Sequence, residues 1–250
     1  MAQVIGCPGP TPKEFPGFCP LGIALLRGLK RKHRRQWFEE RREMYEFKIT
    51  TPLLNLACTI SREFARFAPN YVTVPDKAVF PMYGDVPSRG KQDYQTPAAI
   101  WVRKGPQGMR GACFYFHFTD KEAVVMGGVY YAEPAQLLAY RSLLRDNYRQ
   151  FQEILRQPKL QSLFGELQGE KSRRTPSGFR SDHPAAELNK QKQWYLVSML
   201  DMDLLSTPRL LPTLVEHFEV MAPMVEFLNR PFAQKPMKRL AFAMAPAGGH

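Results

Sequence analysis

The chain has 250 residues, of which 44% are hydrophobic and 12% aromatic, a composition typical of a folded globular protein. A chain of this length buries about 70–75% of its extended surface on folding, so it needs neither a disulfide nor a metal to be stable. The formal net charge is +12, from 35 Lys and Arg against 23 Asp and Glu. This excess indicates an anionic partner, such as nucleic acid, a phosphorylated small molecule or a membrane surface. The alternative is a solvated basic surface without a specific ligand.

The chain contains four cysteines, namely Cys7, Cys19, Cys58 and Cys113. They have no CxxC spacing and no histidine at metal-ligand spacing, so we expect no metal site and no cofactor. No run approaches 18 consecutive apolar residues, and no apolar stretch precedes Cys7 as it does in a lipoprotein signal. These features predict a reduced, cytoplasmic protein without a membrane segment.

The prolines and charges indicate how the chain is organised. Residues 1–20 hold five prolines and three glycines, which predicts an irregular N-terminal lead-in. Residues 21–232 contain neither an internal repeat nor a domain boundary, so we expect one domain. Residues 233–250 are basic, and we expect them to form a mobile tail.

A short apolar helix is predicted over Leu21–Leu29, and the overlapping run Arg27–Arg35 contains no acid. Trp37 and Phe38 follow this run. Basic side chains beside aromatic rings bind phosphates and stack on bases. The other interpretation is that both rings anchor a helix in the core while the basic side chains are solvated.

A longer helix is predicted after Tyr45, because apolar residues recur there every three or four positions. Pro52 interrupts this helix, either as a kink or as a fresh start capped by Thr50 or Thr51. Pro69 ends it.

Three further helices are predicted in the second half of the chain. One opens at Pro134, and another begins near Pro184 after a loop rich in glycine and arginine. The last has Pro208 at its first position and Ser206 or Thr207 as its cap.

The sheet is predicted from three stretches joined by short loops, Ala98–Arg103, Ala112–Thr119 and Ala123–Tyr131. The second stretch alternates between apolar and mixed positions, which is the pattern of a half-buried strand. Its buried face carries Phe114, Phe116 and Phe118. Ala78–Tyr83 predicts a fourth strand, which Pro81 places at an edge or a bulge. The elements together predict a single α+β domain, with an antiparallel sheet of about four strands packed by long helices.

Two adjacent glycines, Gly127 and Gly128, lie within the third of these stretches. Glycine weakens a strand in an ordinary position, so a pair marks a bulge or the close approach of another backbone or a ligand. We expect tight packing at this point.

The candidate ligand-binding residues are Arg89, Lys91, Tyr94 and Arg174. The first three surround a glycine in a short loop, which would bring backbone N–H groups and charge to one phosphate. Arg89 and Lys91 would supply charge, Tyr94 a hydrogen bond, and Asp85 would hold the basic groups in place. The alternative is an ordinary surface loop.

The catalytic candidates are Asp85 and His117. His117 lies in mid-strand on the mixed face, where a histidine can act as a general base if Asp85 or Glu133 orients it. The alternative is a hydrogen-bonded structural histidine. The sequence leaves open whether the protein is an enzyme.

Several stretches between Pro16 and Phe232 resemble one protein family. They are Leu29-Lys30, Arg35-Gln36-Trp37-Phe38, Met126-Gly127-Gly128-Val129-Tyr130, Glu133-Pro134, Thr175-Pro176-Ser177-Gly178-Phe179, Asp182-His183-Pro184 and Phe227-Leu228-Asn229. The chain is similar in these stretches to the conserved hypothetical proteins catalogued as domain of unknown function 2461, which occur mainly in bacteria. The resemblance implies no activity.

This chain departs from the family in one strand-loop segment, where the family has three arginines. Its three arginine positions hold Pro81, Gly84 and Pro87, whereas Asp85, Lys91 and Tyr94 still match. This chain therefore lacks the family's arginines at these three positions.

The sequence supports three hypotheses for function. The first is a cytoplasmic binding protein for a phosphate-bearing or other anionic ligand, either a phosphorylated small molecule or nucleic acid. The second is a hydrolase with a degenerate site, and the third is a basic scaffold that meets nucleic acid or a protein. A concave pocket around the candidate residues would favour the first two, and a flat basic face would favour the third.

Overall fold

The computed structural model describes residues 15–32, 35–79, 98–103 and 111–232. Its strands are β1 (Ala98–Val102), β2 (Cys113–Phe118), β3 (Ala123–Val129) and β4 (Trp194–Leu200), and they form one antiparallel sheet in the order β1-β2-β3-β4. The helices are α1 (Pro20–Lys32), α2 (Arg35–Glu39), α3 (Arg42–Tyr45), the π-helical turn η1 (Glu46–Thr50), α4 (Thr51–Phe67), the 3-10 turn η2 (Pro69–Tyr71), α5 (Pro75–Ala78), α6 (Pro134–Asp146), α7 (Tyr148–Leu155), α8 (Pro158–Phe164), α9 (Ala186–Lys190), the 3-10 turn η3 (Met202–Ser206), α10 (Leu210–Leu228) and the 3-10 turn η4 (Arg230–Phe232). The predicted α+β class with a four-stranded antiparallel sheet is confirmed.

The core lies between one face of the sheet and the helices α4 and α10. The three phenylalanines predicted to point inward from β2 are fully buried. Phe114 packs against Phe64 of α4 and Phe218 of α10, with ring centroids 4.8 and 5.6 Å apart. The two-residue period of β2 therefore decides which face of the sheet the helices cover.

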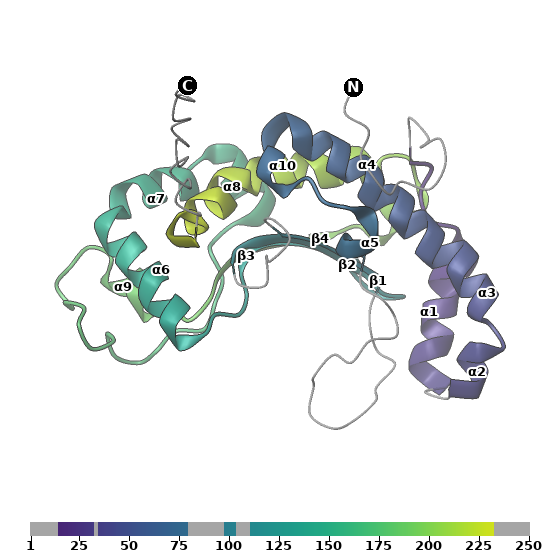
Figure 1. Cartoon of the computed structure of the whole chain (residues 1–250), viewed down its shortest axis with the longest axis horizontal. Helices are drawn as coiled ribbons and strands as arrows, with labels where there is room; N and C mark the ends of the chain where they lie inside the picture. The colour runs from purple at the N-terminus through teal and green to yellow at the C-terminus, as the bar shows by residue number, and fades with distance from the viewer. Residues whose placement is uncertain (1–14, 33–34, 80–97, 104–110, 233–250) are drawn as a thin grey trace, which may run out of the picture.

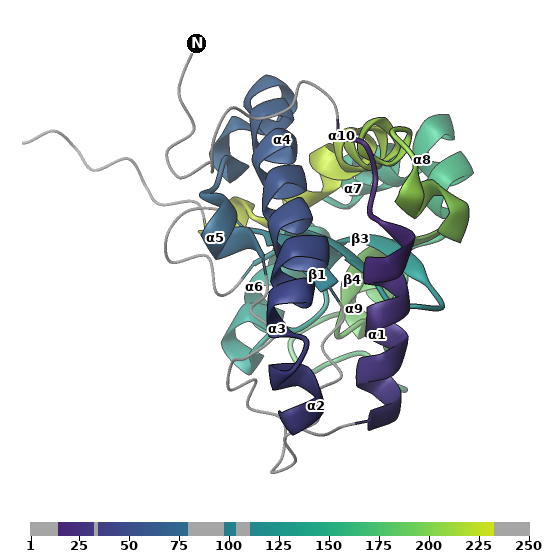
Figure 2. The same cartoon turned by 90° about the vertical axis from the view of Figure 1, so that its right-hand side faces the viewer.

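The other face of the sheet has no described helix packed on it (Figure 1). Helices α1 to α3 lie beyond one end of the sheet, and α6 and α9 lie beyond the other, so the ordered elements form an arch. Turning the molecule by 90° shows α1 alongside α3 (Figure 2).

The fourth strand is not the one that the sequence predicted. Ala78 ends α5, Val79 forms a single β-bridge with Ile100, and residues 80–83 lie outside the described part of the chain. The fourth strand is β4, which pairs with β3 along its whole length. Its sequence is apolar on both faces, so it lacks the alternation that identified β2.

The chain after Tyr45 is helical on both sides of Pro52, so it does not start afresh there from a capping residue. The π-helical turn η1 leads from α3 directly into α4, and Pro52 stands in the first turn of α4. Neither Thr50 nor Thr51 caps the helix with its side chain: the residue before α4 is Thr50 itself, which is helical and makes no cap hydrogen bond. Pro52 has no N–H and cannot donate a helical hydrogen bond. The wider π-helical turn η1 before it accommodates the missing bond.

The later helices begin close to the predicted positions, but their caps differ. Glu133 and Gln136 form a reciprocal capping box before Pro134, which confirms that α6 opens there. Helix α10 begins after Arg209 without a side-chain cap, two residues later than predicted, and α9 likewise begins after Ala185 without one.

The aromatic residues of the N-terminal region serve the core. Phe18 is buried and lies 4.4 Å from Phe118 between ring centroids, although it belongs to the irregular lead-in. Phe38 is buried, and Trp37 packs partly buried against the same core. Both rings therefore act as core anchors, and Arg27 pairs with Asp120 at 3.2 Å.

None of the described helices combines the length and hydrophobicity needed to cross a membrane. Cys58 is buried and disulfide-bonded, which differs from the reduced cysteines predicted from the sequence, while Cys19 and Cys113 are free thiols. The compartment stays a prediction.

Candidate functional site

Most of the predicted ligand-binding residues lie in one segment between α5 and β1. Asp85, Arg89, Lys91 and Tyr94 belong to residues 80–97, which lie outside the described part of the chain. Their roles stay predictions.

His117 lies on the uncovered face of the sheet, half-buried beside the β2–β3 turn. Its Nε2 is 3.5 Å from Glu122 Oε1, and its buried Nδ1 has no hydrogen-bond partner within the described residues. Burial lowers the pKa of His117, and the nearby Glu122 carboxylate opposes this shift. A histidine with a lowered pKa is neutral at pH 7, so His117 supplies no positive charge to an anion.

The acid beside His117 is Glu122, which the sequence assigned to the turn. Glu133 is engaged in the capping box of α6, beyond the opposite end of β3. His117 of β2 pairs with Val124 of β3. Glu122 is the last residue of the turn between these strands, which brings its carboxylate near the His117 ring. Pairing Ala112–Thr119 with Ala123–Tyr131 across the short turn could have identified this neighbour from the sequence.

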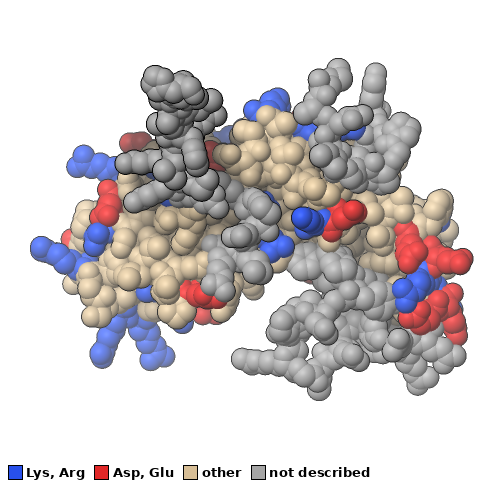
Figure 3. Space-filling view, in the orientation of Figure 1, with Lys and Arg blue, Asp and Glu red and all other residues tan. Residues whose placement is uncertain are grey.

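Arg174 lies in the loop between α8 and α9, where it joins two other exposed cations, Lys171 and Arg173. None of the three makes an ion pair or a side-chain hydrogen bond with another described residue. The run from Lys171 to Ser181 contains four cations and no carboxylate. Lys and Arg side chains project from the end of the molecule that carries this loop (Figure 3).

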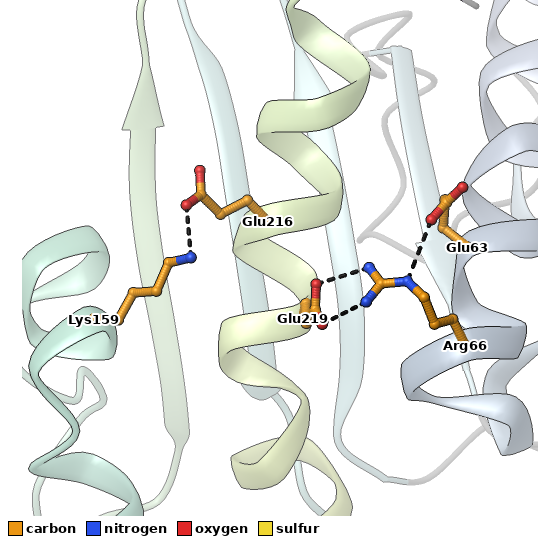
Figure 4. Close-up of polar contacts among 5 residues, drawn as sticks. All are labelled: Glu63, Arg66, Lys159, Glu216 and Glu219. Carbon is orange, nitrogen blue, oxygen red and sulfur yellow. Dashed lines mark hydrogen bonds and ion pairs between the residues drawn. The ribbon is translucent and has the colours of Figure 1, made fainter.

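Two cations on the helices that cover the sheet are matched by acids. Arg66 of α4 lies 2.8 Å from Glu219 of α10 and 3.7 Å from Glu63, and Lys159 of α8 lies 2.8 Å from Glu216 (Figure 4). These pairs link three helices. The loop of Arg174 differs because it brings three cations without ion pairs together within four residues.

Backbone hydrogen bonds hold the basic loop against the start of β4. Gln168 exchanges two bonds with Tyr195, at 2.8 and 3.3 Å, and the Ser172 N–H donates to the Lys190 carbonyl at 2.7 Å. Lys171 forms a β-bridge with Gln191. The cations are therefore presented from a segment with a fixed path.

His117 and Arg174 lie near opposite ends of the sheet. Val124, the partner of His117, pairs with Met199 near the end of β4, whereas the basic loop runs beside Gln191, before β4 begins. The registers therefore place His117 and the basic loop toward opposite ends of β4, and we do not assign them to one site.

A Ser–His pair that the sequence did not indicate lies in the core. Ser198 Oγ is 3.3 Å from His217 Nε2, and His217 Nδ1 is 2.7 Å from the Thr213 carbonyl oxygen, to which it donates. His217 is 5% exposed, and its ring packs edge-on against Phe164. The bond to Ser198 links α10 to β4, and the second ring nitrogen is used by the Thr213 carbonyl, so His217 has a structural role.

Burial of His217 predicts a pH-dependent stability. Burial lowers its pKa below the usual 6.5, so the folded state binds fewer protons than the unfolded state. Its contribution is complete above pH 6.5 and is lost as the pH falls toward the lowered pKa. We expect urea unfolding to show falling stability from pH 7.5 to pH 5. His217→Gln, which keeps a partner for Ser198, is expected to flatten this slope, and an unchanged slope would contradict the assignment.

Within the described ranges, no three His, Cys, Asp or Glu side chains lie close enough together to hold a metal ion.

The comparisons with known proteins identify one family. The family described as Conserved hypothetical protein (DUF2461) matches residues 22–227. No curated protein and no solved structure matches. The chain therefore belongs to the family of conserved hypothetical proteins defined by domain of unknown function 2461.

Proposed function

We propose that this protein binds a phosphate-bearing anion through the loop that carries Arg174. The observation that carries the proposal is the group of three exposed cations, Lys171, Arg173 and Arg174, without ion-pair partners among the described residues. Charge-assisted hydrogen bonds to phosphate are about twice as strong as neutral ones, and arginine can make two in parallel.

The position of this loop within the family supports the proposal. The stretches that resemble the family's late loop, Thr175–Phe179 and Asp182–Pro184, directly follow the three cations. Arg180 is paired with Asp182 at 2.6 Å, so it is not counted among the available charges. Arg89, Lys91 and Tyr94 lie outside the described residues and stay predicted contributors.

The hydrolase alternative, with Asp85 and His117, gains no support from the described residues. His117 faces Glu122, and a base alone does not define a reaction. Anion binding accounts better for the unmatched positive charge.

A thermal shift measurement with tripolyphosphate tests the proposal. A ligand at 100 times its Kd stabilises the folded state by about 2.7 kcal/mol, which raises the Tm of a chain of this size by about 5–10 °C. We expect this rise at constant ionic strength and its loss in Lys171→Ala/Arg173→Ala/Arg174→Ala. Arg89→Ala/Lys91→Ala tests whether these two predicted residues contribute to the binding.

The matched control removes three exposed cations elsewhere, in Lys77→Ala/Arg149→Ala/Arg156→Ala. This variant should keep the rise in Tm. If tripolyphosphate does not stabilise the protein, or if the two triple variants respond alike, the assignment to this loop is wrong.

A further inference from the structure

Exposed aromatic rings occur at the same end of the sheet as the cations of the basic loop. Tyr130 and Tyr131 follow β3 and are 58% and 78% exposed. Rings left this far in water contribute little to the core and are available to a partner. We name this region the basic–aromatic surface and define it by Lys171, Arg173, Arg174, Tyr130, Tyr131 and Tyr195.

Strand β4 connects the tyrosines of this surface with the loop that carries its cations. The Tyr195 ring lies edge-on to Tyr130, with centroids 5.3 Å apart, and the Gln193 side chain donates to the Tyr130 carbonyl at 2.8 Å. On the edge of β4 that faces away from β3, the Tyr195 backbone exchanges hydrogen bonds with Gln168. Six residues separate Gln168 from Arg174, so rings and cations follow one path of up to about 20 Å.

The nearby acids do not neutralise the surface. Glu170 pairs with Lys192 at 3.6 Å, and Glu187 pairs with Lys190 at 2.6 Å. Glu133 caps α6. These acids therefore pair with neighbouring lysines and cap a helix. Glu187 also interacts electrostatically with Lys171 without forming an ion pair, so Arg173 and Arg174 carry the least opposed charge of this surface.

We propose that the basic–aromatic surface binds single-stranded nucleic acid, an inference that rests on the anion-binding function proposed above. Single strands are held by cations that follow the phosphates and by aromatic rings on which the bases stack. A single phosphorylated metabolite would contact only a small part of a path of up to about 20 Å. A duplex is read by a helix or ribbon inserted into a groove, and the helix here, α9, has five residues.

The test measures fluorescence anisotropy of a labelled 12-residue oligouridine with the full chain. An abasic strand with the same phosphates is measured beside it. We expect the oligouridine to bind at least fivefold more tightly than the abasic strand, because each stacked base adds affinity. Tyr131→Ala is expected to lose at least fivefold while the dependence on salt stays the same.

The cation variant gives a different signature. Lys171→Ala/Arg173→Ala/Arg174→Ala should flatten the plot of log affinity against log salt by about 2, since each cation on a single strand contributes about 0.7. The Lys77/Arg149/Arg156 alanine triple should leave the slope nearly unchanged. Circular dichroism and Tm confirm that each variant is folded.

The outcomes separate this inference from the proposed function. Equal binding of the abasic strand and the oligouridine would overturn the nucleic-acid proposal and leave anion binding in place. Binding that none of the surface variants weakens would overturn the assignment to this surface. No binding of either strand, together with no response to tripolyphosphate, would overturn both.

Discussion

Replacing Asn229 with leucine is expected to lower the free energy of unfolding by about 3–5 kcal/mol. Asn229 is 5% exposed and follows α10. Its Oδ1 accepts from the Ala112 N–H at 3.0 Å, and its Nδ2 donates to the Ala112 carbonyl at 2.7 Å and to the Tyr71 hydroxyl at 2.6 Å. Leucine has nearly the same shape but leaves all three partners without a bond in a buried position.

Urea unfolding at pH 7.5 measures this cost, and a thermal scan should show a fall in Tm of about 10 °C. Asn70→Leu is the matched control, because Asn70 is exposed and its replacement should change stability by less than about 0.5 kcal/mol. A loss below about 1 kcal/mol for Asn229→Leu would mean that these bonds contribute little. The result would also explain why Asn229 belongs to a stretch that resembles the family.

The parts of the fold that were predictable are those where a period is visible in the sequence. Phe114, Phe116 and Phe118 alternate with polar or mixed residues, so the buried face of β2 follows from spacing alone. Strand β4 could not be found in this way, because Trp194 and Leu196 are buried on one face while Tyr195 and Val197 are partly covered on the other. A strand of this kind is recognised by its pairing with β3, which is a tertiary fact.

The candidate site was predictable by residue type and not by location. Arg174 was identified from its charge, and it does lie in an unmatched basic loop. Its distance from His117 depends on strand register, which composition and local spacing do not carry. The exposed rings of Tyr130 and Tyr131 were predicted as the end of a strand, because nothing in their sequence distinguishes a buried tyrosine from an exposed one.

The paired glycines of β3 are expected to differ strongly in their tolerance of alanine. Gly128 has a φ of +121°, a region that side chains with a Cβ avoid, and an added Cβ would overlap the Trp194 carbonyl oxygen. Backbone cannot move aside without opening the β3–β4 pairing, so Gly128→Ala should cost about 3–5 kcal/mol. The close approach predicted for this pair is thus a contact with the neighbouring strand.

Gly127 faces a side chain instead. Its added Cβ would overlap Sδ of Met221 and lie 3.3 Å from the Cys113 carbonyl oxygen. Because methionine is flexible, Gly127→Ala should cost about 1–2 kcal/mol. Met221→Ala in the same chain should remove part of the penalty, as a double-mutant cycle in urea would show.

The same cycle at Gly128 should show no relief. Met224 Cε lies 3.2 Å from the position of an added Cβ, but shortening Met224 leaves the Trp194 carbonyl in place. Equal costs for the two glycine variants would mean that β4 can shift away from β3. Gly128→Ala would then also move Tyr195 from Tyr130, so its effect on oligouridine binding links this backbone contact to the basic–aromatic surface.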